Sequence, residues 1–188
     1  FLGLLAHTGA GSWAGPMAVD AYAGETLDEV TVDCFDEAMR GELEAVGFKT
    51  GPGFDGLEAR GPLWGGNLTM VCALTATPHW PRKMRRGVLF LEDVNEHPYR
   101  VERNLLHLQQ AGVLDAQAAV VLGAFSGWKP SPLDRGYTLK SAVDAVRART
   151  KTPILTGLPF GHVPTHVSLP IGRRVTLVVD GRNVLIGW

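Results

Sequence analysis

The stretch GVLFLED, residues 87–93, contains an apolar run that ends at two adjacent carboxylates, Glu92 and Asp93. The run has the length of a strand and no polar alternation, which is typical of a strand covered on both faces in a parallel sheet. Burial disfavours the charge of a carboxylate at such a strand end unless a neighbouring group stabilises it. We therefore expect either a functional partner for these carboxylates or a role in capping the helix that follows.

Helical and extended patterns alternate after this strand. Residues 97–114 and 137–150 predict helices, and residues 118–125 and 152–162 contain two further short apolar strands. Strand, helix, strand, helix and strand indicate a parallel α/β unit with right-handed crossovers. Residues 174–188 alternate around Asp-Gly and predict a β-hairpin.

The first third of the chain has a different pattern. Residues 27–46 repeat apolar residues at helical spacing, with Gly47 as a stop, and residues 49–62 are rich in glycine and proline, which is typical of a linker. Residues 63–78 predict a turn followed by a short buried helix. We therefore expect a division near residue 60.

Composition narrows the class of protein. The 188 residues are 45% hydrophobic and 20% charged, with a net charge of −1, which suits one packed domain or one domain plus part of a second. No basic patch, acidic tail or long apolar run is present, so neither nucleic acid nor a membrane is an expected partner. Cys34 and Cys72 form no CxxC pair and are expected to be reduced, as in a cytoplasmic protein.

Three predicted strands end at residues that can carry chemistry. These are Glu92 with Asp93, then Ser126, then His162, and in open parallel sheets sites gather at the carboxyl ends of strands. A Glu–His pair is the orienting half of a nucleophilic triad. The alternative is that the acids cap a helix and that His162 hydrogen-bonds the backbone.

Two other groups of residues are weaker candidates. His162 and His166 have a spacing that suits a metal on a helix, but Pro164 lies between them, so no metal site is expected. The segment WGGNL, residues 64–68, is either a tight turn or a set of backbone N–H groups that face an anionic oxygen.

Four segments resemble, in order and spacing, the LD-carboxypeptidases, a family of muramoyltetrapeptide carboxypeptidases in the serine peptidase clan that includes the microcin C immunity proteins. The segments are GPLWGGNLTMVCALTATP, GVLFLEDVNEHPYRVERNLLHLQQAGVL, AAVVLGAFSG and PILTGLPFGHVPTHVSLPIG, within residues 61–172. LLAHTGAGSWAGPM, residues 4–17, is similar to the family's segment just after its nucleophile. The resemblance implies that residues 1–60 are the remnant of an N-terminal nucleophile domain together with its linker. It also implies that residues 61–188 form a C-terminal α/β domain with a small barrel-like sheet, which carries the Glu and the His of the triad.

The resemblance also implies an activity. The intact protein would be a cytoplasmic enzyme of murein recycling that removes the terminal D-alanine from a tetrapeptide without a metal or other cofactor. Glu92 and His162 match the family's Glu and His, whereas the family's serine would lie upstream of Phe1. The chain alone is therefore expected to be inactive.

Substrate contacts and partners follow from the same resemblance. Trp64, Gly66, Asn67 and Ser126 are the expected substrate-binding residues. The expected partners are a muropeptide and either a second copy of the chain or a complementing N-terminal fragment.

Other functions stay open at this point. Ser126 or Ser12 is an alternative nucleophile, although neither has the strand-turn-helix setting that exposes one. The chain is alternatively a non-catalytic muropeptide-binding module, a microcin C immunity-type peptidase, or a metallohydrolase that uses Glu92, His162 and His166.

Overall fold

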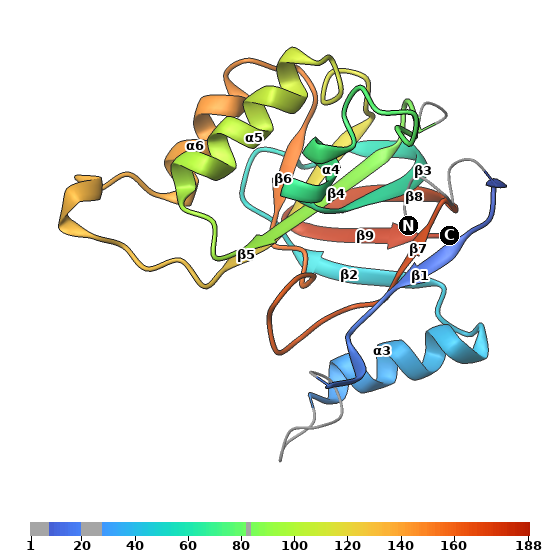
Figure 1. Ribbon diagram of the computed structural model, residues 1–188. Coiled ribbons are helices and arrows are strands. Elements are labelled where there is room, and N and C mark those ends of the chain that lie inside the picture. Colours follow the sequence, from blue (N-terminus) through green and yellow to red (C-terminus); the bar gives the residue numbers. More distant parts are fainter. Residues whose placement is uncertain (1–7, 20–27, 82–83) are drawn as a thin grey trace.

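A seven-stranded sheet forms the centre of the computed structural model, which describes residues 8–19, 28–81 and 84–188 (Figure 1). Neighbouring strands follow the order β2 (Ala45–Lys49), β9 (Asn183–Gly187), β8 (Arg174–Asp180), β3 (Glu58–Asn67), β4 (Val88–Val94), β5 (Ala119–Ser126) and β6 (Ile154–Thr156). The pairs from β3 to β6 are parallel, and those from β2 through β9 and β8 to β3 are antiparallel. The predicted α/β class, with a parallel sheet and a hairpin region, is confirmed.

Strand β4 is buried on both faces, as its unbroken apolar run predicts. Leu89 and Leu91 pack in one hydrophobic cluster with Leu105 and Leu108 of helix α5 (Pro98–Gln110). Helices α4 (Leu68–Ala73) and α6 (Leu139–Arg147) contribute to the same cluster, which therefore covers one face of the parallel strands.

The second cluster joins the parallel and antiparallel halves of the sheet. Phe90 of β4 belongs to it together with Leu177 of β8 and Ile186 of β9. The parallel and antiparallel strands therefore share one core, and the barrel-like sheet stays a prediction.

A smaller layer lies on the side of the second cluster. Strands β1 (Ser12–Ala14) and β7 (Leu169–Ile171) form an antiparallel pair. Helix α3 (Glu29–Arg40) buries Thr31, Cys34 and Ala38 on one face, and Figure 1 shows it apart from α5 and α6. This layer places β1 beside β7 and the loop that precedes β7 beside α3.

Local sequence signals explain several boundaries. Pro98 occupies the first turn of α5, where its missing N–H leaves no hydrogen bond unmade, and His97 precedes it as the N-cap. Thr138 caps α6 by accepting the N–H of Ser141. The β8–β9 hairpin turns at Asp180–Gly181, as predicted.

The prediction of a helix over residues 27–46 is wrong at its C-terminal end. Helix α3 stops at Gly41, which has φ 74° and donates its N–H to the carbonyl of Ala38. Residues Ala45–Lys49 instead form β2. The apolar spacing was ambiguous here because Leu43 and Val46 are both buried, one in a loop and the other in a strand.

The predicted turn at residues 64–67 is also wrong, whereas the predicted linker stays untested: residues 50–57 form neither helix nor strand. Strand β3 begins at Glu58 and runs without a break to Asn67, directly before α4. A short 3-10 helix, η1 (Pro132–Asp134), lies in the loop between β5 and α6. The division near residue 60 stays a prediction, and β2, which precedes it, pairs within the central sheet.

Two remaining observations concern the whole described chain. Cys34 and Cys72 are both free thiols. Among the described residues, no helix has the length and apolar character needed to span a membrane. The predicted helix end at residues 1–8 lies almost entirely outside the described residues.

Candidate active site

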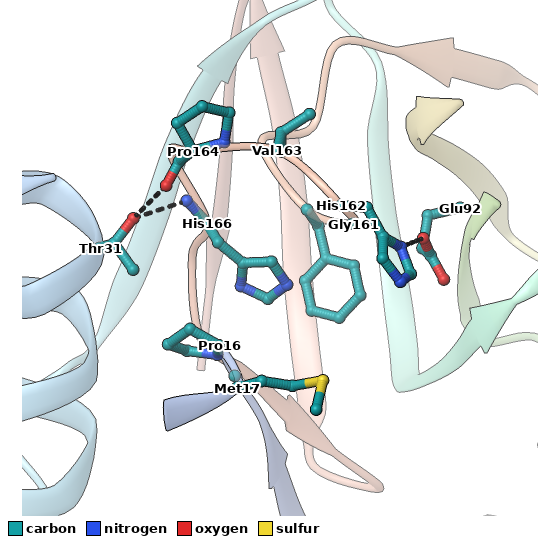
Figure 2. Close-up of a pocket in the computed structure, with 11 residues that line it drawn as sticks. Pro16, Met17, Thr31, Glu92, Gly161, His162, Val163, Pro164 and His166 are labelled. Carbon is teal, nitrogen blue, oxygen red and sulfur yellow. Dashed lines mark hydrogen bonds and ion pairs between the residues drawn. The ribbon is translucent and has the colours of Figure 1, made fainter. Parts of the chain in front are cut away.

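Glu92 and His162 form a hydrogen-bonded pair at the carboxyl edge of the sheet (Figure 2). Nδ1 of His162 lies 3.0 Å from Oε2 of Glu92, across a sequence separation of 70 residues. The predicted contact is therefore present. Because an ionised carboxylate only accepts hydrogen bonds, the neutral imidazole carries its proton on Nδ1 and keeps the lone pair of Nε2 available.

The two members of this pair differ in exposure. The Glu92 side chain is 6% exposed, whereas that of His162 is 52% exposed. Within the described residues, the imidazole makes no other hydrogen bond. An imidazole held through Nδ1 and open at Nε2 has the geometry of a general base.

Asp93 points away from His162 and serves the fold. Its carboxylate accepts the side-chain N–H of Asn67 at 2.8 Å and both the backbone N–H and the hydroxyl of Thr69, at 3.0 and 2.8 Å. It therefore ties the start of α4 to β4. Both roles expected for these carboxylates are therefore present: Glu92 has the imidazole as a partner, and Asp93 stabilises the start of the helix.

The backbone around His162 fits closely against Glu92. Gly161 has φ 125°, and a Cβ added there would lie 3.0 Å from Glu92 Oε2. The carbonyl of Phe160 accepts the N–H of Ala124, and the hydroxyl of Ser126 donates to the carbonyl of His162 at 2.9 Å. A residue with a side chain at position 161 would push these groups apart, so the approach of the loop depends on glycine.

A cavity of about 540 Å³ lies beside the pair. One wall carries Glu92 and His162, and another carries Thr31 of α3 with His166 (Figure 2). Met17, which follows β1, also lines the cavity. The remaining lining residues are Gly15, Pro16, Phe160, Gly161, Val163 and Pro164.

The expected substrate-binding residues are in different places. Asn67 pairs with Glu92 in the parallel β3–β4 register, and Gly66 precedes it, so both lie next to the acid in the sheet. The Asn67 side chain caps α4 and donates to Asp93. Trp64 is 1% exposed and donates its indole N–H to Gln117, so its side chain does not reach the cavity.

None of the candidate serines bonds the His162 ring. The Ser126 hydroxyl binds the backbone carbonyl of His162, and Ser12 lies in strand β1 with its hydroxyl on the carbonyl of Trp13. Neither hydroxyl donates to the available ring nitrogen.

His166 lines the same cavity as His162, on the wall that also carries Thr31. Its ring packs on Phe160, with centroids 4.4 Å apart, and its backbone N–H donates to the Thr31 hydroxyl. Among the described residues, no group of three or more His, Cys, Asp and Glu side chains is arranged to hold a metal ion.

Sequence reasoning missed the contribution of helix α3 to this site. Thr31 lines the cavity, yet it is separated by more than a hundred residues from the loop that it contacts. The only local signal is the Asp28 N-cap with Thr31 three residues later, which predicts a helix start but not its neighbour.

Comparison with known proteins identifies the fold and the family. Residues 60–177 match the family model described as the LD-carboxypeptidase C-terminal domain. The chain belongs to this family.

Individual relatives agree with that family. The murein tetrapeptide carboxypeptidase of Pseudomonas aeruginosa is 30% identical over 126 residues, which cover 66% of this chain and 39% of that protein. The crystal structure of muramoyltetrapeptide carboxypeptidase from Oxalobacter formigenes is 40% identical, with a TM-score of 0.87, and the match covers 100% of this chain and 65% of that one.

A third relative shows the fold alone. A microcin C7 self-immunity protein is 21% identical, with a TM-score of 0.81, and the match covers 100% of this chain and 63% of that one. The chain spans less than half the length of the sequence relatives that it matches, among them proteins from Synechocystis, Bacillus subtilis and Pseudomonas.

Proposed function

We propose that the intact protein is a serine-type LD-carboxypeptidase that removes the terminal D-alanine from murein tetrapeptides. The single observation that carries this is the 3.0 Å hydrogen bond between His162 Nδ1 and Glu92 Oε2 beside a cavity. Membership of a peptidase family supports the reaction class. The names of the Pseudomonas and Oxalobacter relatives support the substrate class.

In this mechanism the nucleophile is a serine outside residues 1–188. Nε2 of His162 accepts the serine proton as the serine oxygen bonds to the carbonyl carbon that precedes D-alanine. Glu92 stabilises the imidazolium that forms. The C–N bond then breaks as His162 returns the proton to the amine of D-alanine, and a water molecule, activated in the same way, releases the peptide from the serine.

Backbone groups near the pair complete the proposed site. Gly66 and Asn67 lie beside Glu92 in the β3–β4 register, and we assign substrate contacts to this end of β3. Ser126 supports the site through its bond to the His162 carbonyl. We assign residues 1–60 to the end of a nucleophile-bearing domain and residues 61–188 to the domain that carries Glu92 and His162.

We also propose a cytoplasmic role in peptidoglycan recycling and a homodimeric state. The two free thiols support a reducing compartment. Val178 and Leu185 are exposed and directly paired across β8 and β9, which leaves apolar surface for a second copy. Sedimentation of the intact protein at several concentrations tests the dimer.

Release of D-alanine from a purified murein tetrapeptide by the intact protein tests the activity. We expect release that is insensitive to a chelator and is lost in His162→Gln. Binding of the tetrapeptide without release would instead indicate a binding module. Inhibition by the chelator would favour a metallohydrolase, and cleavage of a peptide-nucleotide alone would indicate a microcin immunity-type peptidase.

A further inference from the structure

We propose that Thr31 is a positioning residue for the reaction, because its hydroxyl holds the loop that carries His162. This inference rests on the proposed function, in which His162 is the general base. It assigns a role in the chemistry to helix α3, which lies outside the residues matched by the family model.

The hydroxyl of Thr31 joins both sides of the loop tip. Its oxygen lies 3.0 Å from the carbonyl oxygen of Pro164 and accepts the backbone N–H of His166 at 2.8 Å. Asp28, one turn earlier, accepts the hydroxyl of Thr165 at 2.8 Å and also lies 2.8 Å from the Thr31 hydroxyl. Thr165 and His166 are therefore bonded to the start of α3, and the Pro164 carbonyl competes with Asp28 for the single proton of the Thr31 hydroxyl.

The opposite side of the loop is held by the sheet. Glu92 binds the His162 ring, and Ser126 donates to the His162 carbonyl. The base of the loop is closed by the N–H of Val167, which donates to the carbonyl of Pro159 at 2.9 Å. His162 thus lies in a segment of seven residues, 160–166, whose tip is fixed between α3 and the ends of β4 and β5.

Removing the Thr31 hydroxyl would release one side of this loop. Thr31 is 2% exposed, so water cannot readily replace it at the Pro164 carbonyl and the His166 N–H. The ring of His162 is half exposed and, among the residues that the structure describes, is hydrogen-bonded through Nδ1 alone, so few contacts keep its direction. The Glu92–His162 geometry therefore depends on the distant hydroxyl.

Thr31→Val in the intact protein tests this role, because valine keeps the side-chain volume and removes the hydroxyl. We expect kcat for D-alanine release to fall roughly 10- to 100-fold with KM nearly unchanged, since a displacement of about 1 Å in a catalytic group has an effect of that size. Thr31→Ser keeps the hydroxyl and should restore kcat. Thr138→Val removes a capping hydroxyl from α6, far from the site, and should leave kcat unchanged.

A spectroscopic measurement separates this inference from the proposed function. The ring ¹⁵N signals of His162, assigned with His162→Gln, should show the Nδ1–H tautomer in the wild type and in Thr31→Ser, and a mixture of tautomers in Thr31→Val. Wild-type signals and wild-type kcat in Thr31→Val would overturn the positioning role. If Thr31→Val does not fold, Thr165→Val tests the attachment of the loop to α3 by removing the hydrogen bond from Thr165 to Asp28. An unchanged kcat and an unchanged His162 tautomer in that variant would equally overturn the positioning role.

The outcome for the proposed function is independent of these results. If His162→Gln releases D-alanine at the wild-type rate, the proposed function is wrong, whatever Thr31 does. If His162→Gln is inactive and Thr31→Val is fully active, the proposed function stands and the role of Thr31 is wrong.

Discussion

Replacing Glu92 by glutamine removes the charge that faces the His162 imidazole and keeps nearly the same volume. The wild-type bond spans 3.0 Å and involves an acid that is 4% exposed. A hydrogen bond to a charged group contributes about 1.5–3 kcal/mol, which corresponds to a roughly 10- to 150-fold change in rate. This range is the lower bound for the loss of kcat.

A second effect enlarges the loss. The amide of glutamine donates as well as accepts, so it can bind Nδ1 without its proton and favour the Nε2–H tautomer, which cannot take a proton from a nucleophile. In a serine peptidase triad the corresponding acid-to-amide change lowers kcat by about 10⁴-fold. Because the His162 ring is half exposed and water competes for it, we expect a value between these limits, about 10² to 10⁴.

The assay is the initial rate of D-alanine release by the intact protein, with unfolding temperature as a check on folding. Glu96→Gln is the matched control, since Glu96 lies four residues further on and forms an ion pair with Arg100, at 3.7 Å. A folded Glu92→Gln variant that keeps kcat within tenfold of the wild type would refute the role of Glu92.

Four further predictions concern stability and reactivity. Asp93→Ala removes the acceptor of the partly exposed Asn67 and Thr69 donors and should lower the free energy of unfolding by about 2 kcal/mol in urea titration; an unchanged free energy of unfolding would contradict the role of Asp93. Gly161→Ala places a Cβ 3.0 Å from Glu92 Oε2 at φ 125°, so D-alanine release should fall at least tenfold, and full activity would contradict the close fit. Burial raises the pKa of the Cys72 thiol to about 11, so a thiol reagent should modify it slowly at pH 8 and faster toward pH 11; rapid labelling at pH 8 would be inconsistent with this. Hydrogen bonds from Thr31 lower the pKa of Asp28 below its ordinary 3.8, so the ionised carboxylate stabilises the fold above that pH and this stabilisation is lost as the pH falls. The difference in free energy of unfolding between the wild type and Asp28→Asn should therefore shrink below about pH 4. A difference that stays constant with pH would argue against these hydrogen bonds.

The parallel half of the fold was readable from the sequence because its signals are local. A continuous apolar run predicted β4, and Pro98 and Thr138 marked the starts of α5 and α6. The β2 region was misread, because Val46 follows Met39 and Leu43 at helical spacing although it lies in a strand. Pairing with β9, more than a hundred residues away, decides this case, and short-range periodicity does not contain that information.

The site was readable only in part for the same reason. Strand ends at one sheet edge brought Glu92 and His162 together, as the topology predicts. Trp64 precedes two glycines and resembles a site residue in sequence, yet the pleat of β3 turns its side chain into the opposite cluster. Thr31 could not be found, because its role depends on where α3 docks and not on its neighbours in sequence.

Labelling of the intact protein by a fluorophosphonate, followed by peptide mass mapping, tests most directly whether His162 and Glu92 activate a serine. We expect a label on one serine outside residues 1–188, formed rapidly in the wild type and Glu96→Gln and at a strongly reduced rate in His162→Gln and Glu92→Gln. A label on Ser126 or Ser12, or equal labelling rates in all four proteins, would show that this pair is not the base that activates the nucleophile.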